Sequence, residues 1–297
     1  MQYSTIPMIL ALLRTIRPKQ WIKNTVVGVP LVFGHKLTDI ASLQITLLAV
    51  ALFCLISGCV YIINDIVDVE RDRSHPKKRN RPVASGKLPI NVARGFAVLA
   101  VPFALGVAYW LSPAYAAALS GYFVLNLAYC FKIKHIPYLD VLSLAAGFVL
   151  RVLAGAFVIE VPPSPWLMGC TALLALFLGF GKRAHELANS GDATSQRAVL
   201  AYYRSDILTW MLHILALITV VVYGLYTQSD HVRETFGDAP LIYTLPFPMI
   251  GIPRFIHLVT TRHDAESPTE EMLRDPIFMI TFFSWLIVST GVLYGWF

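Results

Sequence analysis

Long apolar stretches dominate this sequence and constrain its fold more than any other feature. A helix that crosses the roughly 30 Å hydrocarbon core of a bilayer needs about 20 such residues. The stretches are continuously apolar rather than alternating, which favours helices over the strands of a membrane barrel. Only 14% of the residues are charged, against roughly 25% in soluble domains. We therefore expect an all-α polytopic membrane protein with nine transmembrane helices, at 22–36, 45–64, 91–111, 115–131, 139–160, 165–181, 207–227, 241–260 and 277–296.

The basic residues collect on one side of these nine spans. Nearly all of the 24 Lys and Arg residues precede the first span or lie in loops on that same side, whereas Lys36 and Arg233 lie on the other. The positive-inside rule then places the N-terminus in the cytoplasm and the C-terminus outside, in a cell membrane. These loops account for the net charge of +6, so we expect no nucleic-acid partner.

We expect one membrane domain over residues 1–297. Residues 1–21 hold a short apolar run and no cleavage site, which is typical of an amphipathic helix at the membrane surface. The longest polar segments, 65–90 and 182–206, fall on the expected cytoplasmic side and are expected to be catalytic loops. No pattern in the chain sets an oligomeric state.

Three aspartates follow the second expected span. If the helix continues past the span, Asp65, Asp68 and Asp72 share one stripe of it, at i, i+3 and i+7. Carboxylates gathered in this way repel one another and favour a cation between them. Hard oxygen ligands suit Mg²⁺, which takes its remaining ligands from water and substrate phosphates. The alternative is an acidic helix end paired with the basic run at 71–86, and that run is suited either to clamping a diphosphate or to contacting anionic lipid.

Other polar residues at the expected span ends extend this candidate site. Arg151 lies inside a span, where a charge is costly and usually faces the interior of the bundle. We expect it to contact a substrate phosphate or an inner carboxylate such as Glu160, with a purely structural pair as the alternative. For Lys23 and Asn24, the alternative to substrate binding is anchoring of the chain at the membrane interface. For Arg183 and Glu186, the alternative is a simple pair between residues three positions apart on one helix. The other candidate substrate-binding residues are Lys23, Asn24, Asn64, Arg79, Arg81, Tyr129, Lys132, Lys134, Asp140, Lys182, Arg183 and Glu186.

This combination resembles the UbiA superfamily of intramembrane prenyltransferases. Its members have nine transmembrane helices around a cavity and an NDxxDxxxD motif after the second helix. Asn64, Asp65, Asp68 and Asp72 match all four positions of that motif, and the resemblance covers essentially the whole chain. It implies that Asp65, Asp68 and Asp72 are catalytic and bind Mg²⁺.

The sequence departs from the ordinary prenyltransferases after the sixth span. Their second acidic motif, DxxxD, helps to hold two Mg²⁺ ions on a prenyl diphosphate, whereas residues 181–192 here read GKRAHELANSGD. Basic residues in place of acids suit an additional phosphate better than a second metal. In this departure the chain resembles one branch of the superfamily. The resemblance to that branch is also visible in the segments RPKQWIKN, NDIVDVERDRSHPKKRNRP, FKIKHIPYLDVLSLAAGFVLR and GKRAHE.

That branch consists of glycosyltransferases that move 5-phosphoribose from 5-phosphoribosyl 1-diphosphate (PRPP) to a polyprenyl phosphate. The resemblance implies the same reaction here, with decaprenyl phosphate as the acceptor and membrane lipid around the chain. Diphosphate leaves, and the product leads to decaprenylphosphoryl-arabinose and cell-wall arabinan. Two alternatives stay open: an aromatic or porphyrin prenyltransferase that uses a prenyl diphosphate, and a membrane transporter or lipid-binding scaffold.

Overall fold

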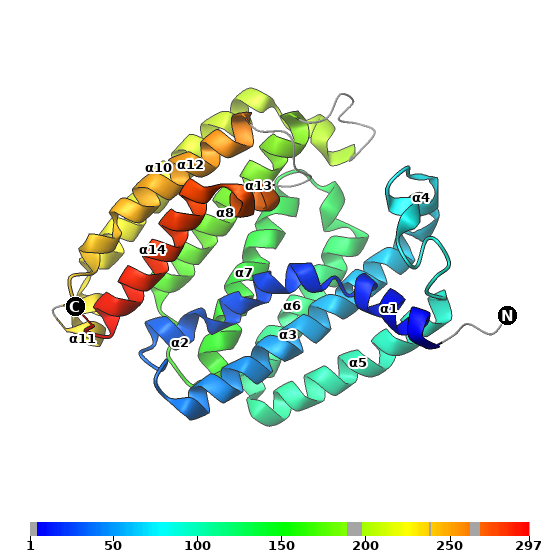
Figure 1. Ribbon diagram of the computed structural model, residues 1–297, viewed down its shortest axis with the longest axis horizontal. Helices are drawn as coiled ribbons and strands as arrows, with labels where there is room; N and C mark the ends of the chain where they lie inside the picture. The colour runs from blue at the N-terminus through cyan, green and yellow to red at the C-terminus, as the bar shows by residue number, and fades with distance from the viewer. Residues whose placement is uncertain (1–4, 189–197, 238, 262–267, 297) are drawn as a thin grey trace. The chain divides into compact units, whose positions relative to one another are not determined.

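The computed structural model describes residues 5–188, 198–237, 239–261 and 268–296, and every regular element among them is helical. The expected all-α class is confirmed (Figure 1). The elements are α1 Thr5–Thr15, η1 Pro18–Gly28, α2 Val29–Phe33, α3 Ile40–Val67, α4 Val69–Ser74, η2 Lys78–Asn80, α5 Ile90–Leu111, α6 Pro113–Phe131, η3 Ile133–His135, α7 Leu139–Val158, α8 Pro165–Ala188, η4 Ala198–Tyr202, α10 Ser205–Thr227, α11 Asp230–Phe236, η5 Leu241–Thr244, α12 Pro246–Thr261, α13 Pro268–Arg274 and α14 Pro276–Leu293.

Eight helical segments in the described part of the chain are long and apolar enough to cross a membrane. They are α3, α5, α6, α7, α8, α10, the combined η5 and α12, and α14, and each matches one expected span. The remaining expected span, 22–36, is helical in two pieces, η1 and α2. Gly28 and Pro30 lie where the pieces meet, and both residues disfavour an uninterrupted α-helix.

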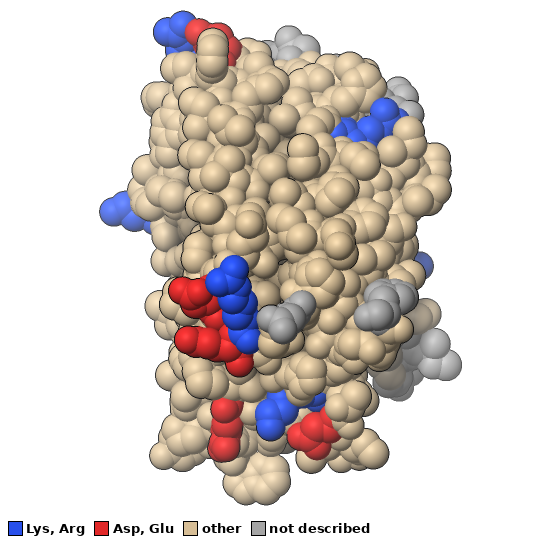
Figure 2. Space-filling model, turned by 90° about the vertical axis from the view of Figure 1, so that its left-hand side faces the viewer, with Lys and Arg blue, Asp and Glu red and all other residues tan. Residues whose placement is uncertain are grey.

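The outer surfaces of the long helices are apolar. In α10 and α14, the side chains of Trp210, Leu217 and Ile280 are about two-thirds or more exposed, at 71%, 66% and 67%. Figure 2 shows one face of the molecule on which wide areas carry neither acidic nor basic side chains. Such a surface is compatible with lipid rather than water, so the chain is a multi-pass membrane protein.

The chain forms two compact units. The first comprises Met1–Ile133 and Val149–Pro163, and the second comprises Lys134–Phe148 and Ser164–Phe297. The expectation that residues 1–297 make one domain stays a prediction. Part of the segment expected as a loop at 182–206 is helical, because α8 continues to Ala188.

Close contacts in the first unit join η1, α3, α6 and the second part of α7. The Tyr115 hydroxyl of α6 donates to the Ala49 carbonyl of α3 at 2.9 Å, and Phe53 packs among the same buried side chains. A Cβ atom on Gly155 of α7 would lie 1.9 Å from the carbonyl oxygen of Val27 in η1. Only glycine permits this approach, which brings η1 against α7.

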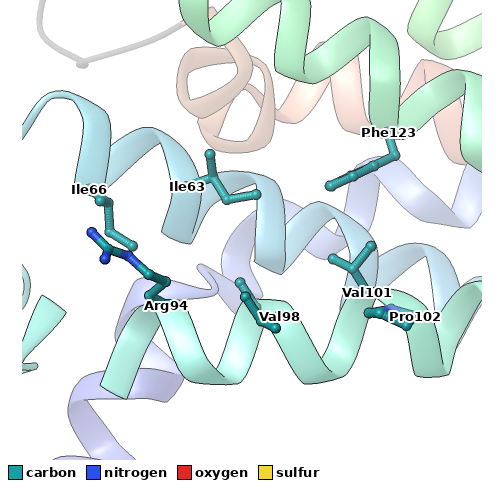
Figure 3. Close-up of a pocket in the computed structure, with 8 residues that line it drawn as sticks. Ile63, Ile66, Arg94, Val98, Val101, Pro102 and Phe123 are labelled. Atoms are coloured by element: carbon teal, nitrogen blue, oxygen red, sulfur yellow. The ribbon is translucent and has the colours of Figure 1, made fainter. Parts of the chain in front are cut away.

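A groove with a volume of about 350 Å³ lies between α3, α5 and α6 (Figure 3). Its lining is mainly apolar, and Arg94 and Ile66 lie at one end of it. Ile63 also lines the groove, whereas Asp65 of the same helix bonds to arginines outside the groove lining. The groove is therefore separate from the carboxylates of α3.

The second unit is built around four helices, α8, α10, α12 and α14 (Figure 1). In this unit α8 packs against α10, α10 against α12, and α12 against α14. Asp275 caps α14 by accepting from the Phe278 backbone at 2.9 Å, and it also accepts from Arg254 of α12 at 2.6 Å. Gly181 of α8 lies so near Phe255 of α12 that an added Cβ would be 2.5 Å from the ring. Glycine at this position allows α8 and α12 to pack closely.

Candidate functional site

Two of the three motif aspartates are buried at the end of α3 and in α4. Asp65 is 2% exposed and Asp72 is 3% exposed, while Asp68 is half-buried. Asp68 lies between the two helices with φ −91° and ψ 8°, and its backbone caps both of them. The helix is therefore interrupted at Asp68. The condition under which the three carboxylates would share one stripe of a continuous helix is not met.

Arg81 joins the two buried carboxylates. Its Nη1 donates to Asp72 Oδ2 at 2.6 Å and to Asp65 Oδ1 at 3.3 Å. The loop that carries Arg81 is anchored by two buried apolar residues, Val83 and Leu88, which pack in the core beside α3 and α5. This anchoring places Arg81 at the acidic motif, where it makes the pairing of acidic helix end and basic run that we considered as the alternative, and substrate binding by Arg81 stays a prediction.

Arg17 is a further site residue that sequence reasoning did not select. Its Nη2 donates to Asp65 Oδ1 at 2.6 Å, and its guanidinium lies 4.6 Å from the centre of the Tyr61 ring. Arg17 has φ 52° and ψ 67°, a left-handed conformation, immediately before Pro18. A non-glycine residue in this region costs about 1–2 kcal/mol, so the contacts of its side chain must offset that cost. The position before a proline was the available signal, since proline restricts the preceding residue.

An inner polar group surrounds Arg151, which is 8% exposed. Arg151 Nε donates to Asn24 Oδ1 and Nη2 donates to the Tyr122 oxygen, both at 2.9 Å. Its guanidinium also lies 4.6 Å from the centre of the Tyr122 ring, and Asn24 Nδ2 donates to Ser57 Oγ at 3.0 Å. Arg151 thus bonds to Asn24 and Tyr122, whereas Glu160, the inner carboxylate considered from the sequence, is exposed.

Lys23 lies in η1, outside the eight candidate spans, and adds a third cation near Arg17 and Arg151. Burial lowers the pKa of Lys23 from its ordinary value, and the positive charges of Arg151 and then Arg17 lower it further. The first unit therefore holds a concentration of positive charge near the predicted Mg²⁺ ligands. Such a place favours an anionic ligand.

In the second unit, Asp140 and Arg183 form a fully buried ion pair. Arg183 Nε donates to Asp140 Oδ2 at 2.8 Å, both side chains have 0% exposure, and Arg183 also pairs with Glu186. The Tyr203 hydroxyl donates to Asp140 Oδ1 at 2.5 Å and accepts from the Tyr138 backbone at 2.7 Å. Burial and the bond to Asp140 raise the pKa of Tyr203, so this hydroxyl remains a donor. The alternative of structural pairing fits Arg183 and Glu186.

The other predicted residues are distributed over both units. Lys182 is 3.9 Å from Glu186 and its side chain is 40% exposed. The first unit also contains Asn64, Tyr129, Lys132 and Arg79, and the second contains Lys134. Arg79 and Lys132 are exposed, while Asn64, Tyr129 and Lys134 are half-buried. Substrate-binding roles for all of these residues stay predictions.

The carboxylates of the first unit fit a metal that takes few protein ligands. Within the described residues, no three His, Cys, Asp or Glu side chains are grouped as a complete metal site. The bonds from Arg17 and Arg81 use one oxygen each of Asp65 and Asp72, and the described part of the chain donates to neither Asp65 Oδ2 nor Asp72 Oδ1. Mg²⁺ is commonly held by one or two carboxylates together with water and substrate phosphates. The donor set therefore suits Mg²⁺ carried by a phosphorylated substrate.

Comparisons with characterised proteins cover nearly the whole chain. The decaprenyl-phosphate phosphoribosyltransferase of Mycolicibacterium smegmatis is 32% identical over 302 residues, 97% of this chain and 93% of that protein. The decaprenyl-phosphate phosphoribosyltransferase of Corynebacterium glutamicum is also 32% identical, over 95% of this chain and 86% of that protein.

The fold is also similar to that of a solved structure. The structure of a UbiA homologue from Archaeoglobus fulgidus bound to GPP and Mg²⁺ matches with a TM-score of 0.72, at 18% identity, over 96% of this chain and 99% of that chain. The model of the UbiA prenyltransferase family matches residues 25–287. The family expected from the acidic motif is confirmed, and the chain belongs to the UbiA prenyltransferase family.

Proposed function

We propose that this membrane enzyme transfers 5-phosphoribose from PRPP to a polyprenyl phosphate and releases diphosphate. The observation that carries the proposal is the similarity to decaprenyl-phosphate phosphoribosyltransferases over nearly the full length of both chains. The site agrees with it in charge, because Arg17, Lys23, Arg81 and Arg151 accompany the carboxylates of the first unit. PRPP and the lipid together bring three phosphate-containing groups, which need several separate cations.

The carboxylates and cations have different tasks in this reaction. A bound Mg²⁺ would supply positive charge that stabilises the leaving diphosphate. Asp65 Oδ2 and Asp72 Oδ1, which accept no bond from Arg17 or Arg81, would hold that metal, and Asp68 between them is a further predicted ligand. Arg81, bonded to both buried carboxylates, keeps these two side chains in a fixed relation.

The reaction needs no general base from the chain. A phosphate monoester is already an anion at neutral pH, so an oxygen of the lipid phosphate attacks C1 of the ribose directly. The new bond joins that oxygen to C1, and the bond from C1 to the diphosphate breaks with its electron pair on the diphosphate. Positive charge on the ribose ring in the transition state is balanced by the adjacent phosphates. Catalysis then consists of positioning and electrostatic stabilisation.

The test is a transfer assay with the purified protein, Mg²⁺, labelled PRPP and decaprenyl phosphate. We expect a labelled lipid that requires all four components, and its absence would reject the proposal. Asp65→Asn and Asp72→Asn should lower the rate by at least about 100-fold, in the range of losing an electrostatic catalytic group. Glu70→Gln is the matched control, because Glu70 lies in α4 beside Asp72 but is exposed and pairs with Arg73.

A prenyl diphosphate donor is the competing assignment within the same family. The solved Archaeoglobus fulgidus homologue is bound to GPP and Mg²⁺, which shows that this fold accepts a prenyl diphosphate. Turnover of a prenyl diphosphate with an aromatic acceptor, independent of PRPP, would favour it. A transporter or scaffold would instead keep its transport or lipid binding in Asp65→Asn and show no transfer with either donor.

The cellular setting follows from the same proposal. The basic side of the spans would face the cytoplasm, where PRPP is available, with the C-terminus outside the cell membrane. The acceptor's polyprenyl tail would lie in the bilayer. The product would serve cell-wall arabinan synthesis through decaprenylphosphoryl-arabinose.

A further inference from the structure

Two guanidinium groups neutralise the two buried carboxylates of the first unit. Asp65 Oδ1 accepts from Arg17 at 2.6 Å and from Arg81 at 3.3 Å, and Asp72 Oδ2 accepts from Arg81 at 2.6 Å. The Arg17 and Arg81 side chains are themselves 30% and 28% exposed, so part of each guanidinium-bearing side chain stays accessible while it pairs with a buried carboxylate. The formal charge of these four groups is zero.

This neutrality makes the place unfavourable for a divalent ion by itself. A lone Mg²⁺ at Asp65 Oδ2 and Asp72 Oδ1 adds two positive charges next to two guanidinium ions, and Asp68, the third predicted ligand, brings only one further negative charge. Lys23 is a further nearby cation. A metal that arrives on a diphosphate carries a net negative charge, and the same guanidinium ions then attract it.

We propose that Arg17 and Arg81 determine the order of binding, so that the site takes its metal only together with the phosphate groups of the donor. This inference rests on the proposed function for the identity of the donor, PRPP. It also assigns a role to Arg17, which was not among the candidate site residues chosen from the sequence. When the donor binds, Arg17 and Arg81 keep their bonds to Asp65 and Asp72 and direct their remaining N–H groups to the phosphates.

The backbone at Arg17 supports a specific role for this side chain. Its left-handed conformation, φ 52° before Pro18, is one that most residues avoid, and such strain is commonly retained where function needs it. The side chain is then held on two sides, by Asp65 at 2.6 Å and by the Tyr61 ring at 4.6 Å. A residue that only contributed charge to the surface would not need this fixed placement.

The experiment measures metal binding without turnover. Mn²⁺ replaces Mg²⁺, and the free ion is quantified by electron paramagnetic resonance with purified wild-type protein, Arg17→Gln and Arg14→Gln. Arg14→Gln is the matched control, because it removes the same charge from an exposed position three residues away that contacts neither Asp65 nor Asp72. Each protein is titrated with Mn²⁺ alone, with Mn²⁺ and inorganic diphosphate, and with Mn²⁺ and PRPP.

We expect the wild type and Arg14→Gln to bind Mn²⁺ weakly alone and much more tightly with PRPP or diphosphate. Arg17→Gln should bind Mn²⁺ alone about tenfold more tightly, a change that corresponds to about 1.4 kcal/mol, and should gain less from the anions. Arg17→Lys keeps the charge and should behave like the wild type. If Arg17→Gln does not give a cooperative melting transition, Arg81→Gln replaces it with the same expectation.

Wild-type protein that binds Mn²⁺ equally well with and without the anions would overturn the inference. So would a gain in Mn²⁺ affinity shared by Arg17→Gln and Arg14→Gln. A different result speaks against the proposed function alone: if diphosphate or a prenyl diphosphate promotes Mn²⁺ binding and PRPP does not, the order of binding stands and the donor is not PRPP.

Discussion

Replacing Tyr122 by Phe removes one oxygen atom from the inner polar group and leaves its ring in place. That oxygen accepts a hydrogen bond at 2.9 Å from Arg151, which is 8% exposed. The variant Tyr115→Phe makes the same chemical change two turns earlier on the same face of α6, where the hydroxyl of a fully buried tyrosine donates at 2.9 Å to a backbone carbonyl. The pair therefore compares the loss of a bond to a charged group with the loss of a neutral one.

The two losses should differ in size. Hydrogen bonds between side chains of membrane helices average about 0.6 kcal/mol, and we expect about that loss of unfolding free energy for Tyr115→Phe. A bond to a charged group contributes about 1.5–3 kcal/mol, so Tyr122→Phe should lose about 1 to 2 kcal/mol more. Because Tyr122 also orients Arg151, we expect kcat/KM for PRPP to fall about threefold to tenfold in this variant, equivalent to about 0.7–1.4 kcal/mol. The control should keep the wild-type value.

Unfolding by denaturant in a fixed detergent, followed by circular dichroism, gives the free energies, and the transfer assay gives kcat/KM. Equal losses of stability in Tyr122→Phe and Tyr115→Phe would refute the view that the charge of Arg151 strengthens its bond. An unchanged kcat/KM together with the larger loss of stability would refute the view that Arg151 contacts PRPP, and would leave it a structural residue.

Four further outcomes are expected. Arg183→Met should lower the unfolding free energy by about 3–5 kcal/mol because it leaves Asp140 charged and buried, whereas adding Asp140→Leu should restore much of it; a double variant no more stable than Arg183→Met would contradict this. PRPP binding measured by calorimetry should weaken as pH rises through the lowered pKa of Lys23, since the folded protein loses that proton below the ordinary lysine range, and Lys23→Arg should remove the effect. Over the same pH window the unfolded chain binds more protons, so unfolding free energy should rise with pH in the wild type and stay level in Lys23→Arg. Chelation of divalent ions should abolish transfer and added Mg²⁺ should restore it, and transfer that persists in excess chelator would exclude a metal requirement.

The order of the membrane-spanning helices was predictable because each of them is a long, continuously apolar stretch of the sequence. Eight of the expected spans coincide with long helices, and their bounds differ mainly at the ends. The segment 22–36 was harder, since its mean hydropathy does not reveal that Gly28 and Pro30 divide it into η1 and α2. Likewise, the spacing of Asp65, Asp68 and Asp72 does not show that the helix is interrupted at Asp68.

Candidate site residues could be chosen from the sequence where they belong to a motif. Residues that reach the site only through tertiary contacts could not. Arg81 was selected from the basic run, and it contacts both buried carboxylates. Arg17 was not selected, because only the tertiary fold brings it to Asp65, 48 positions further along the chain. The fully buried pair of Arg183 with Asp140 shows the reverse, since a charge pattern cannot distinguish an open cationic residue from one enclosed by a partner on another helix.

The approach of η1 to α7 has a consequence for how this enzyme can vary. Gly155 sits one helical turn beyond Arg151, and the carbonyl of Val27 occupies the volume that any larger residue would require. A methyl group there would force η1 outward and carry Asn24 away from Arg151. A residue without a side chain therefore sets the alignment of polar groups that it never touches, and homologues that lack this glycine should have to orient their inner arginine by some other means.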